Sequence, residues 1–80
     1  MATRDEIFRR VQGIICDKLG KEVYDVKESS SLRCDLGMDS LDIMELGMEV
    51  EEQFKVGITD EELAKFKSVK SLVDIIASKY

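Results

Sequence analysis

The 80-residue sequence contains no histidine, no proline and no tryptophan, and it has only two cysteines. Without histidine the chain lacks the usual general base near neutral pH, the Ser-His and Cys-His nucleophilic pairs, and mixed Cys/His zinc sites. We therefore expect a protein that is not itself an enzyme, with no catalytic residues and no metal site. Cys16 and Cys34 do not form a CxxC motif, so two free thiols in a reducing compartment are favoured, with a disulfide between them as the open alternative.

Long apolar runs are also missing: the runs present are a few residues long, whereas about 20 residues are needed to cross a bilayer. The first residues, Met-Ala-Thr-Arg-Asp-Glu, form neither an apolar signal core nor an acid-poor transit pattern. The net charge of −5 disfavours nucleic acid and anionic membranes as partners, and it favours proteins with a basic surface. We expect a cytoplasmic monomer with protein partners, no nucleic-acid partner and no insertion into membranes.

What the sequence does contain is helical periodicity. A helix is predicted from about Arg4 to Leu19, because Thr3 and Glu6 have the spacing of a capping box and Gly20 stands where a helix end favours positive φ. The following segment, residues 21–38, has no sustained period and is predicted to be a long loop, of a kind that usually signals function. Its expected apolar anchors to the core are Val23, Val26, Leu32 and Leu36.

Three further helices are predicted. One starts at Asp39 and Ser40 and ends near Lys55, with a buried stripe of Leu46, Val50 and Phe54. A short helix follows a Thr59–Glu62 capping box and extends to about Phe66, with Leu63 and Phe66 facing inward. The last is capped by Ser68 and places Val69, Leu72, Val73 and Ile76 on one face. The predicted fold is all-α: one domain, residues 1–80, forming a small irregular four-helix bundle of three longer helices and one short helix.

The most specific pattern is Asp-Leu-Gly-Met-Asp-Ser-Leu-Asp-Ile-Met-Glu-Leu at residues 35–46. It resembles the phosphopantetheine-attachment signature of acyl carrier proteins. The positions that carry the match are Leu36, Gly37, Asp39, Ser40, Leu41, Asp42, Glu45 and Leu46. Helix order, loop length, the Glu-Glu-Gln-Phe end of the second helix and chain length resemble the same family.

Ser40 suits this role on physical grounds. With Gly37 easing the turn, its hydroxyl would project from the first turn of a helix, where free N–H groups and the helix dipole favour a phosphate by about 0.3–1 kcal/mol. Since the chain has no histidine to act as base, Ser40 is predicted to be an acceptor that another enzyme modifies. The alternative is that Asp39 and Ser40 simply cap the helix.

The resemblance implies a cofactor and partners. It implies that a holo-acyl carrier protein synthase transfers 4'-phosphopantetheine from coenzyme A to Ser40, flanked by Asp39, with magnesium. The thiol of the arm would then hold acyl groups as thioesters and deliver them to fatty-acid synthesis enzymes. A specialised carrier of polyketide, aminoacyl or other acyl groups is the alternative within this chemistry, and Met38 and Thr59 depart from residues frequent in bacterial fatty-acid carriers.

An acidic segment follows the motif. Residues 35–62 contain ten acids and one basic residue, Lys55, so like charges on the second helix repel one another. We interpret one side of this helix as a docking surface for basic patches of partner enzymes, as in the family, with a merely solvated face as the alternative. The acidic members are Asp42, Glu45, Glu49 and Glu52, and the apolar anchors are Leu41 and Met48.

The resemblance also implies that an acyl chain enters between the helices. The candidate lining residues are Met44, Leu46, Gly47, Val50, Ile58 and Leu63. Gly47 departs from the apolar residue usual at this position and costs about 1 kcal/mol of helix propensity relative to alanine. Room for an acyl chain and close packing of two helices are both possible reasons for it.

Two other classes of protein compete with the carrier interpretation. A calcium-binding EF-hand fails, because counting from Asp35 puts Ser40 where the template requires glycine and Leu46 where it requires glutamate. Weak, unselective binding of divalent ions by the carboxylates stays compatible with the sequence. The other class is an acidic interaction module that never receives a cofactor.

Overall fold

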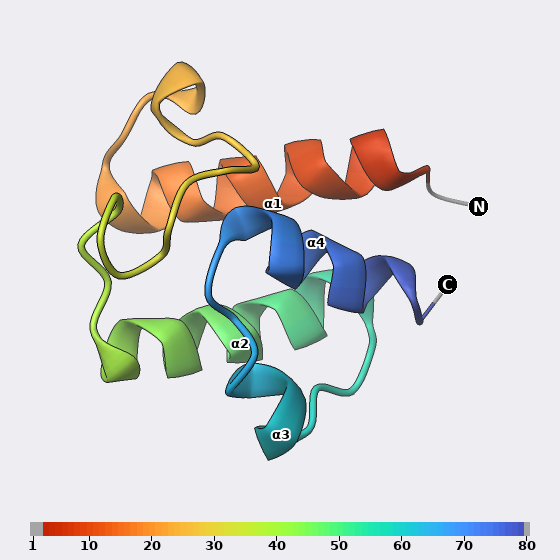
Figure 1. Ribbon diagram of the computed structural model, residues 1–80. Coiled ribbons are helices and arrows are strands. Elements are labelled where there is room, and N and C mark those ends of the chain that lie inside the picture. The colour runs from red at the N-terminus through yellow and green to blue at the C-terminus, as the bar shows by residue number, and fades with distance from the viewer. Residues whose placement is uncertain (1–2, 80) are drawn as a thin grey trace.

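The computed structural model describes residues 3–79. Its helices are α1 (Arg4–Leu19), α2 (Ser40–Phe54), α3 (Asp60–Leu63) and α4 (Val69–Ala77), with a single 3-10 turn, η1 (Val23–Asp25), between α1 and α2. In Figure 1, α4 lies between α1 and α2, and the short α3 lies at the lower edge beside α2. The all-α fold with three longer helices and one short one is confirmed, and no strand occurs among residues 3–79.

The helix ends follow local capping chemistry. Thr59 and Glu62 form the predicted capping box at α3, and Ser68 caps α4 by accepting from the Ser71 N–H at 3.2 Å. At α1 the capping bond observed is half a box, from the Glu6 N–H to Thr3 Oγ1 at 3.2 Å. Gly20 ends α1 with φ of 66°, in the left-handed region predicted for it.

The core lies where the faces of α1, α2 and α4 meet. The predicted stripes of α2 and α4 are buried, and Ile7, Val11 and Ile15 of α1 pack against them. Apolar burial of this kind contributes about 25 cal/mol per Å² and is the main favourable term in folding. The start of α1 is also tied to α4 at the surface, where Arg4 Nη2 lies 2.7 Å from Asp74 Oδ1.

The connection between α1 and α2 is more structured than predicted. Val26, Leu32 and Leu36 are buried as expected, but Val23 is 54% exposed, so its predicted role as an anchor is wrong. The side-chain amide of Gln12 holds this part of the loop instead, because its Nε2 donates to the Val23 and Val26 carbonyls at 2.7 and 2.8 Å. Polar contacts to the backbone therefore replace burial of Val23.

The end of α3 also differs from the prediction, because the helix stops at Leu63 rather than near Phe66. The Lys67 carbonyl accepts from the Leu32 N–H at 2.9 Å, and Ser31 and Ser68 form an antiparallel bridge. These bonds draw the backbone out of the helix, although Phe66 is still buried. The same bonds fix the α1–α2 loop beside the start of α2.

No helix among residues 3–79 has the length and apolar character needed to cross a membrane.

Candidate functional site

Ser40 is the first residue of α2, and its side chain is exposed. The cap of this helix is made by its neighbours: Asp39 Oδ1 accepts from the Asp42 N–H at 2.9 Å, and Asp42 Oδ2 accepts from the Asp39 N–H at 3.2 Å. Asp39 is therefore a helix cap, but the hydroxyl of Ser40 has no part in capping. The Ser40 hydroxyl is therefore exposed and available for modification.

The turn before Ser40 depends on Gly37, which has φ of 68°. A residue with a side chain costs about 1–2 kcal/mol in this left-handed conformation. On either side of Gly37, Leu36 and Met38 are buried, and the Met38 N–H donates to the Leu32 carbonyl at 2.9 Å. The Leu-Gly-Met sequence thus anchors the loop in the core and lets the chain emerge at Asp39 and Ser40.

The hydroxyl of Ser40 has one hydrogen-bond partner among the described residues, Arg33. Arg33 Nη2 donates to Ser40 Oγ at 3.0 Å, and guanidinium is a donor that cannot take up a proton. The carboxylates that flank Ser40 in the sequence, those of Asp39 and Asp42, are engaged by backbone N–H groups. No group of residues 3–79 is placed to withdraw the serine proton, which agrees with a hydroxyl that serves as an acceptor.

A phosphodiester on Ser40 Oγ fits these surroundings. The oxygen is exposed, it stands at the amino end of a 15-residue helix, and a cation is in contact with it. Each of these features favours an anion. Sequence reasoning missed Arg33, because its approach to Ser40 depends on the fold of the 31–36 turn and no periodicity or motif spacing reports it.

The expected docking residues lie along the exposed side of α2. Leu41 and Met48 are 62% and 61% exposed, as predicted for apolar anchors. Glu45, Met48, Glu49 and Glu52 come together with Lys18 around a shallow hollow. Lys18 Nζ lies 3.3 Å from Glu45 Oε1, whereas Glu49 and Glu52 form no ion pair with any residue in the range 3–79.

Asp42 differs from the other acids, because it is partly buried and its carboxylate closes the capping box.

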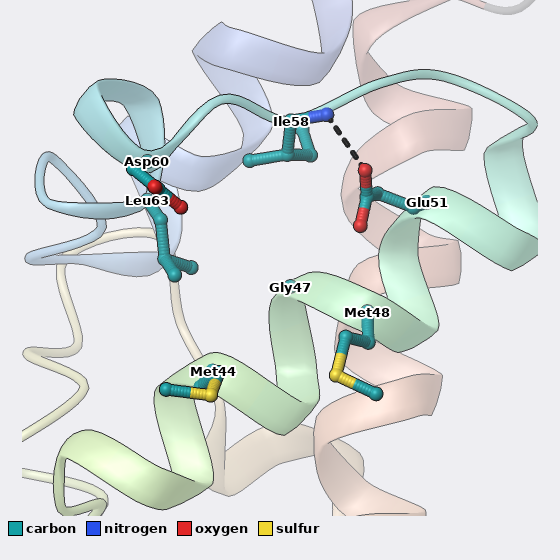
Figure 2. Close-up of a pocket in the computed structure, with 7 residues that line it drawn as sticks. All are labelled: Met44, Gly47, Met48, Glu51, Ile58, Asp60 and Leu63. Atoms are coloured by element: carbon teal, nitrogen blue, oxygen red, sulfur yellow. Dashed lines mark hydrogen bonds between the residues drawn. The ribbon is translucent and has the colours of Figure 1, made fainter.

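Four of the six expected acyl-pocket residues line one small pocket between α2 and α3, shown in Figure 2. They are Met44, Gly47, Ile58 and Leu63, and they are joined by Met48, Glu51 and Asp60. The pocket has a volume of about 130 Å³. The other two expected residues, Leu46 and Val50, are fully buried in the core and do not line it.

Gly47 brings α2 and Leu63 into close contact. A Cβ atom on Gly47 would lie 2.8 Å from Leu63 Cδ1, which is closer than real Cβ contacts come. Figure 2 shows the Leu63 side chain extending from α3 toward the helix that carries Gly47. Of the two possible reasons for Gly47, the structure therefore supports close packing. Leu63 occupies the space that a larger residue at position 47 would fill.

Glu51 holds the rim of this pocket, a function that the sequence did not suggest. Its Oε2 accepts from the Ile58 N–H at 2.9 Å, the bond dashed in Figure 2. The bond spans the turn after Lys55, which has φ of 56° and ends α2. It holds the backbone of Ile58 at the edge of the pocket.

The two cysteines are free and differ in environment. Cys16 is buried in α1, and burial raises the pKa of its thiol, with smaller contributions from Asp17, Glu22 and Asp25. Cys34 is exposed in the loop before the motif.

Within residues 3–79, no three His, Cys, Asp or Glu side chains are grouped as a metal ion would require.

Comparison with known proteins identifies the family. The family model described as "Phosphopantetheine attachment site" matches residues 9–76. An acyl carrier protein of Thermotoga maritima is 43% identical over 79 residues, covering 99% of this chain and 98% of the relative. One from Clostridium acetobutylicum is 46% identical over 70 residues, covering 88% and 91%.

Solved structures agree with the sequence relatives. The acyl carrier protein of Enterococcus faecalis superposes with a TM-score of 0.82 at 33% identity, covering 99% of this chain and 100% of that one. A crystal structure of the Thermotoga maritima protein gives a TM-score of 0.81 at 36% identity, covering 95% and 88%. This chain therefore belongs to the acyl carrier protein family, whose members are carriers rather than enzymes and bear 4'-phosphopantetheine as their prosthetic group.

Proposed function

We propose that Ser40 carries the 4'-phosphopantetheine arm, and that the chain, as one cytoplasmic carrier domain over residues 1–80, delivers acyl thioesters to fatty-acid synthesis enzymes. The observation that carries this proposal is the Ser40 hydroxyl: it is exposed in the first turn of α2 and takes no part in the helix cap. Its only hydrogen-bond partner within residues 3–79 is a cation, Arg33.

The roles of the chain's own atoms follow from this geometry. Ser40 Oγ is the atom that would form the new bond to phosphorus, while the pyrophosphate bond of coenzyme A breaks and the adenosine 3',5'-bisphosphate part leaves. The serine proton has to pass to a base on the modifying enzyme. The entry into α2, made by Gly37 and the Asp39–Asp42 box, places Ser40 at the exposed start of the helix. When attached, the arm supplies a terminal thiol that forms thioesters.

The exposed side of α2 is the proposed docking surface for the holo-acyl carrier protein synthase and for fatty-acid synthesis enzymes with basic patches. Glu49 and Glu52, which have no ion pair within residues 3–79, can attract such patches without first giving up an internal partner. Leu41, next to Ser40, and Met48, two turns further along the same helix, supply exposed apolar area. Glu45 contributes after releasing Lys18, and Asp42 contributes mainly by holding the cap.

The pocket between α2 and α3 is the proposed entry for the acyl chain. Its volume of about 130 Å³ is well below the roughly 300–1,000 Å³ typical of small-molecule sites, so a long chain has to widen it. Leu63 is the side chain whose movement would do so, because it fills the space over Gly47. Leu46 and Val50 would then contact the chain only after the pocket has deepened into the core.

The attachment is tested by intact mass. Apo-protein incubated with coenzyme A, magnesium and a holo-synthase is expected to gain one phosphopantetheine, and Ser40→Ala is expected to gain none. Ser29→Ala, which removes an exposed serine of the loop before α2, is the matched control and should be modified like the parent. Modification of Ser40→Ala would refute the assignment.

A further inference from the structure

We propose that Arg33 is a positioning residue for the phosphodiester on Ser40: its guanidinium holds the phosphate oxygens and orients the root of the prosthetic arm. This inference rests on the proposed function, because it takes Ser40 as the point of attachment. It starts from the contact already present in the unmodified protein, where Arg33 Nη2 lies 3.0 Å from Ser40 Oγ.

The charge of Arg33 is not neutralised by any acid of residues 3–79. No carboxylate of residues 3–79 lies within 4 Å of its guanidinium, although the sequence around it is strongly acidic. The nearby acids are engaged by backbone N–H groups: Asp35 Oδ2 accepts from Ser31 at 2.7 Å, and Asp39 and Asp42 close the helix cap. Because no acidic side chain of residues 3–79 pairs with it, the Arg33 guanidinium is available to bind the phosphate once Ser40 has been modified.

The backbone that carries Arg33 is held firmly. Its neighbour Leu32 is fully buried and donates its N–H to the Lys67 carbonyl at 2.9 Å. On the other side, the Cys34 N–H donates to Ser31 Oγ at 3.1 Å, and the Leu36 N–H donates to the Ser31 carbonyl at 3.0 Å. Little conformational freedom is left to lose in the main chain when the guanidinium takes up a ligand.

Esterification turns this hydrogen bond into an ion pair. The phosphorus would be bonded to Ser40 Oγ, so its charged oxygens would be two bonds from the atom that Arg33 already contacts. Guanidinium presents its donors as a planar fork that matches phosphate oxygens, and each charge-assisted bond is stronger than the neutral one it replaces. Arg33 thereby offsets the repulsion that the new anion meets from Asp39 and Asp42.

The coupling between Arg33 and the phosphate can be measured with four species: apo and holo forms of the parent and of Arg33→Gln. Denaturant unfolding of the four gives a thermodynamic cycle in which the effect of the substitution on the fold itself cancels. We expect the phosphate and Arg33 to be coupled by about 1.5-fold to fivefold in the unfolding equilibrium constant, the range of an exposed ion pair, and the coupling should shrink in high salt. Arg33→Lys, which keeps the charge but loses the fork, should restore part of it.

A spectroscopic readout accompanies the cycle. The ³¹P resonance of the holo-protein should shift and narrow in Arg33→Gln, because the phosphate becomes more mobile, and it should lose its dependence on salt. The control is Arg9→Gln, which removes an exposed arginine of α1 whose nearest carboxylate, on Asp5, lies 3.8 Å away. A ³¹P spectrum of Arg33→Gln that matches that of Arg9→Gln, or a cycle without coupling, would overturn the proposal.

Failure of this inference is distinguishable from failure of the proposed function. Intact mass reports whether Ser40 is modified, whereas the cycle and the ³¹P spectrum report whether Arg33 contacts the phosphate afterwards. If holo-Arg33→Gln forms normally and its phosphate behaves as in the parent, Ser40 keeps its role and Arg33 loses the one proposed here.

Discussion

The side chain of Leu63 rests against the bare Cα of Gly47, where an added Cβ would stand 2.8 Å from Leu63 Cδ1. This contact seats the short helix α3 on α2 and closes the pocket that Met44, Met48 and Ile58 also line. The atom in the way is the far end of a flexible side chain, so the contact can yield by rotation of Leu63. Gly47 and Leu63 together set how readily the pocket opens.

Alanine substitutions at two helical glycines test this contact. Gly13 of α1 has open space around it, so Gly13→Ala should stabilise the fold by about 1 kcal/mol through helix propensity alone. Gly47→Ala should gain less or lose stability, because Leu63 has to move. In a Leu63→Ala background, Gly47→Ala should again stabilise the fold through helix propensity. Urea unfolding measures the free energy of unfolding of each variant. Equal gains at both glycines in the parent would contradict the packing described.

Charge reversal on α2 tests the docking surface. Glu49→Lys should leave the fold intact and slow association with a holo-synthase, with a smaller dependence of the rate on salt. Asp25→Lys makes the same change of charge in η1, on the other side of α1 from α2 in Figure 1, and should behave like the parent. Association rates measured by stopped flow at several salt concentrations separate the two. If both variants slow equally, net charge rather than this surface governs binding.

Glu45→Lys tests the docking surface less specifically than Glu49→Lys does. It should weaken partner binding too, but it also removes the ion pair with Lys18 and places two cations beside each other. Its stability therefore has to be measured together with its binding.

The order of the helices and the position of Ser40 could be predicted from the sequence because both depend on local signals. Capping residues, glycine at the end of α1 and apolar spacing specify each helix independently of the rest. The exposed positions of Leu41 and Met48 followed from the same periodicity.

The features that could not be predicted from the sequence depend on contacts between segments far apart in the chain. The end of α3 is set by the bond from Leu32 to Lys67, and the exposure of Val23 by the amide of Gln12, neither of which leaves a local pattern. The contact of Arg33 with Ser40 arises in the same way, from the fold of a loop. The structure of loops held by such bonds is therefore the hardest to predict from residue propensities.

Acid should destabilise the fold through Asp74 and Glu62. Arg4 and then Lys70 hold the pKa of Asp74 below its ordinary value, and the Thr59 N–H and then Lys79 do the same for Glu62. Because the folded pKa is the lower one, the stabilisation is complete above the ordinary carboxyl pKa of about 4 and is lost as the pH falls through the folded value.

We therefore expect the thermal midpoint to drop between about pH 5 and pH 3, and to drop less steeply in Asp74→Asn. Asp25→Asn, an exposed aspartate without an ion pair to residues 3–79, should keep the slope of the parent. Parallel curves for the parent and Asp74→Asn would contradict the role given to Arg4 and Asp74.

The two thiols should react at different rates. Exposed Cys34 should be modified quickly by a thiol reagent, whereas Cys16, whose pKa is raised by burial, should react only after unfolding. Counting the modified thiols over time in buffer and in urea measures this, with Cys34→Ser leaving only the slow reaction. Fast modification of Cys34→Ser in buffer would mean that α1 does not bury Cys16.

The most direct test of the account is the position of the prosthetic group in the chain. Trypsin cleaves after Arg33 and Lys55, and the resulting peptide, residues 34–55, contains Ser40 as its only serine and Cys34 as its only cysteine. In holo-protein this peptide should carry the phosphopantetheine mass, and fragmentation should assign it to Ser40. Phosphopantetheine found on any other residue, or an unmodified 34–55 peptide in protein whose intact mass includes the group, would contradict the central claim.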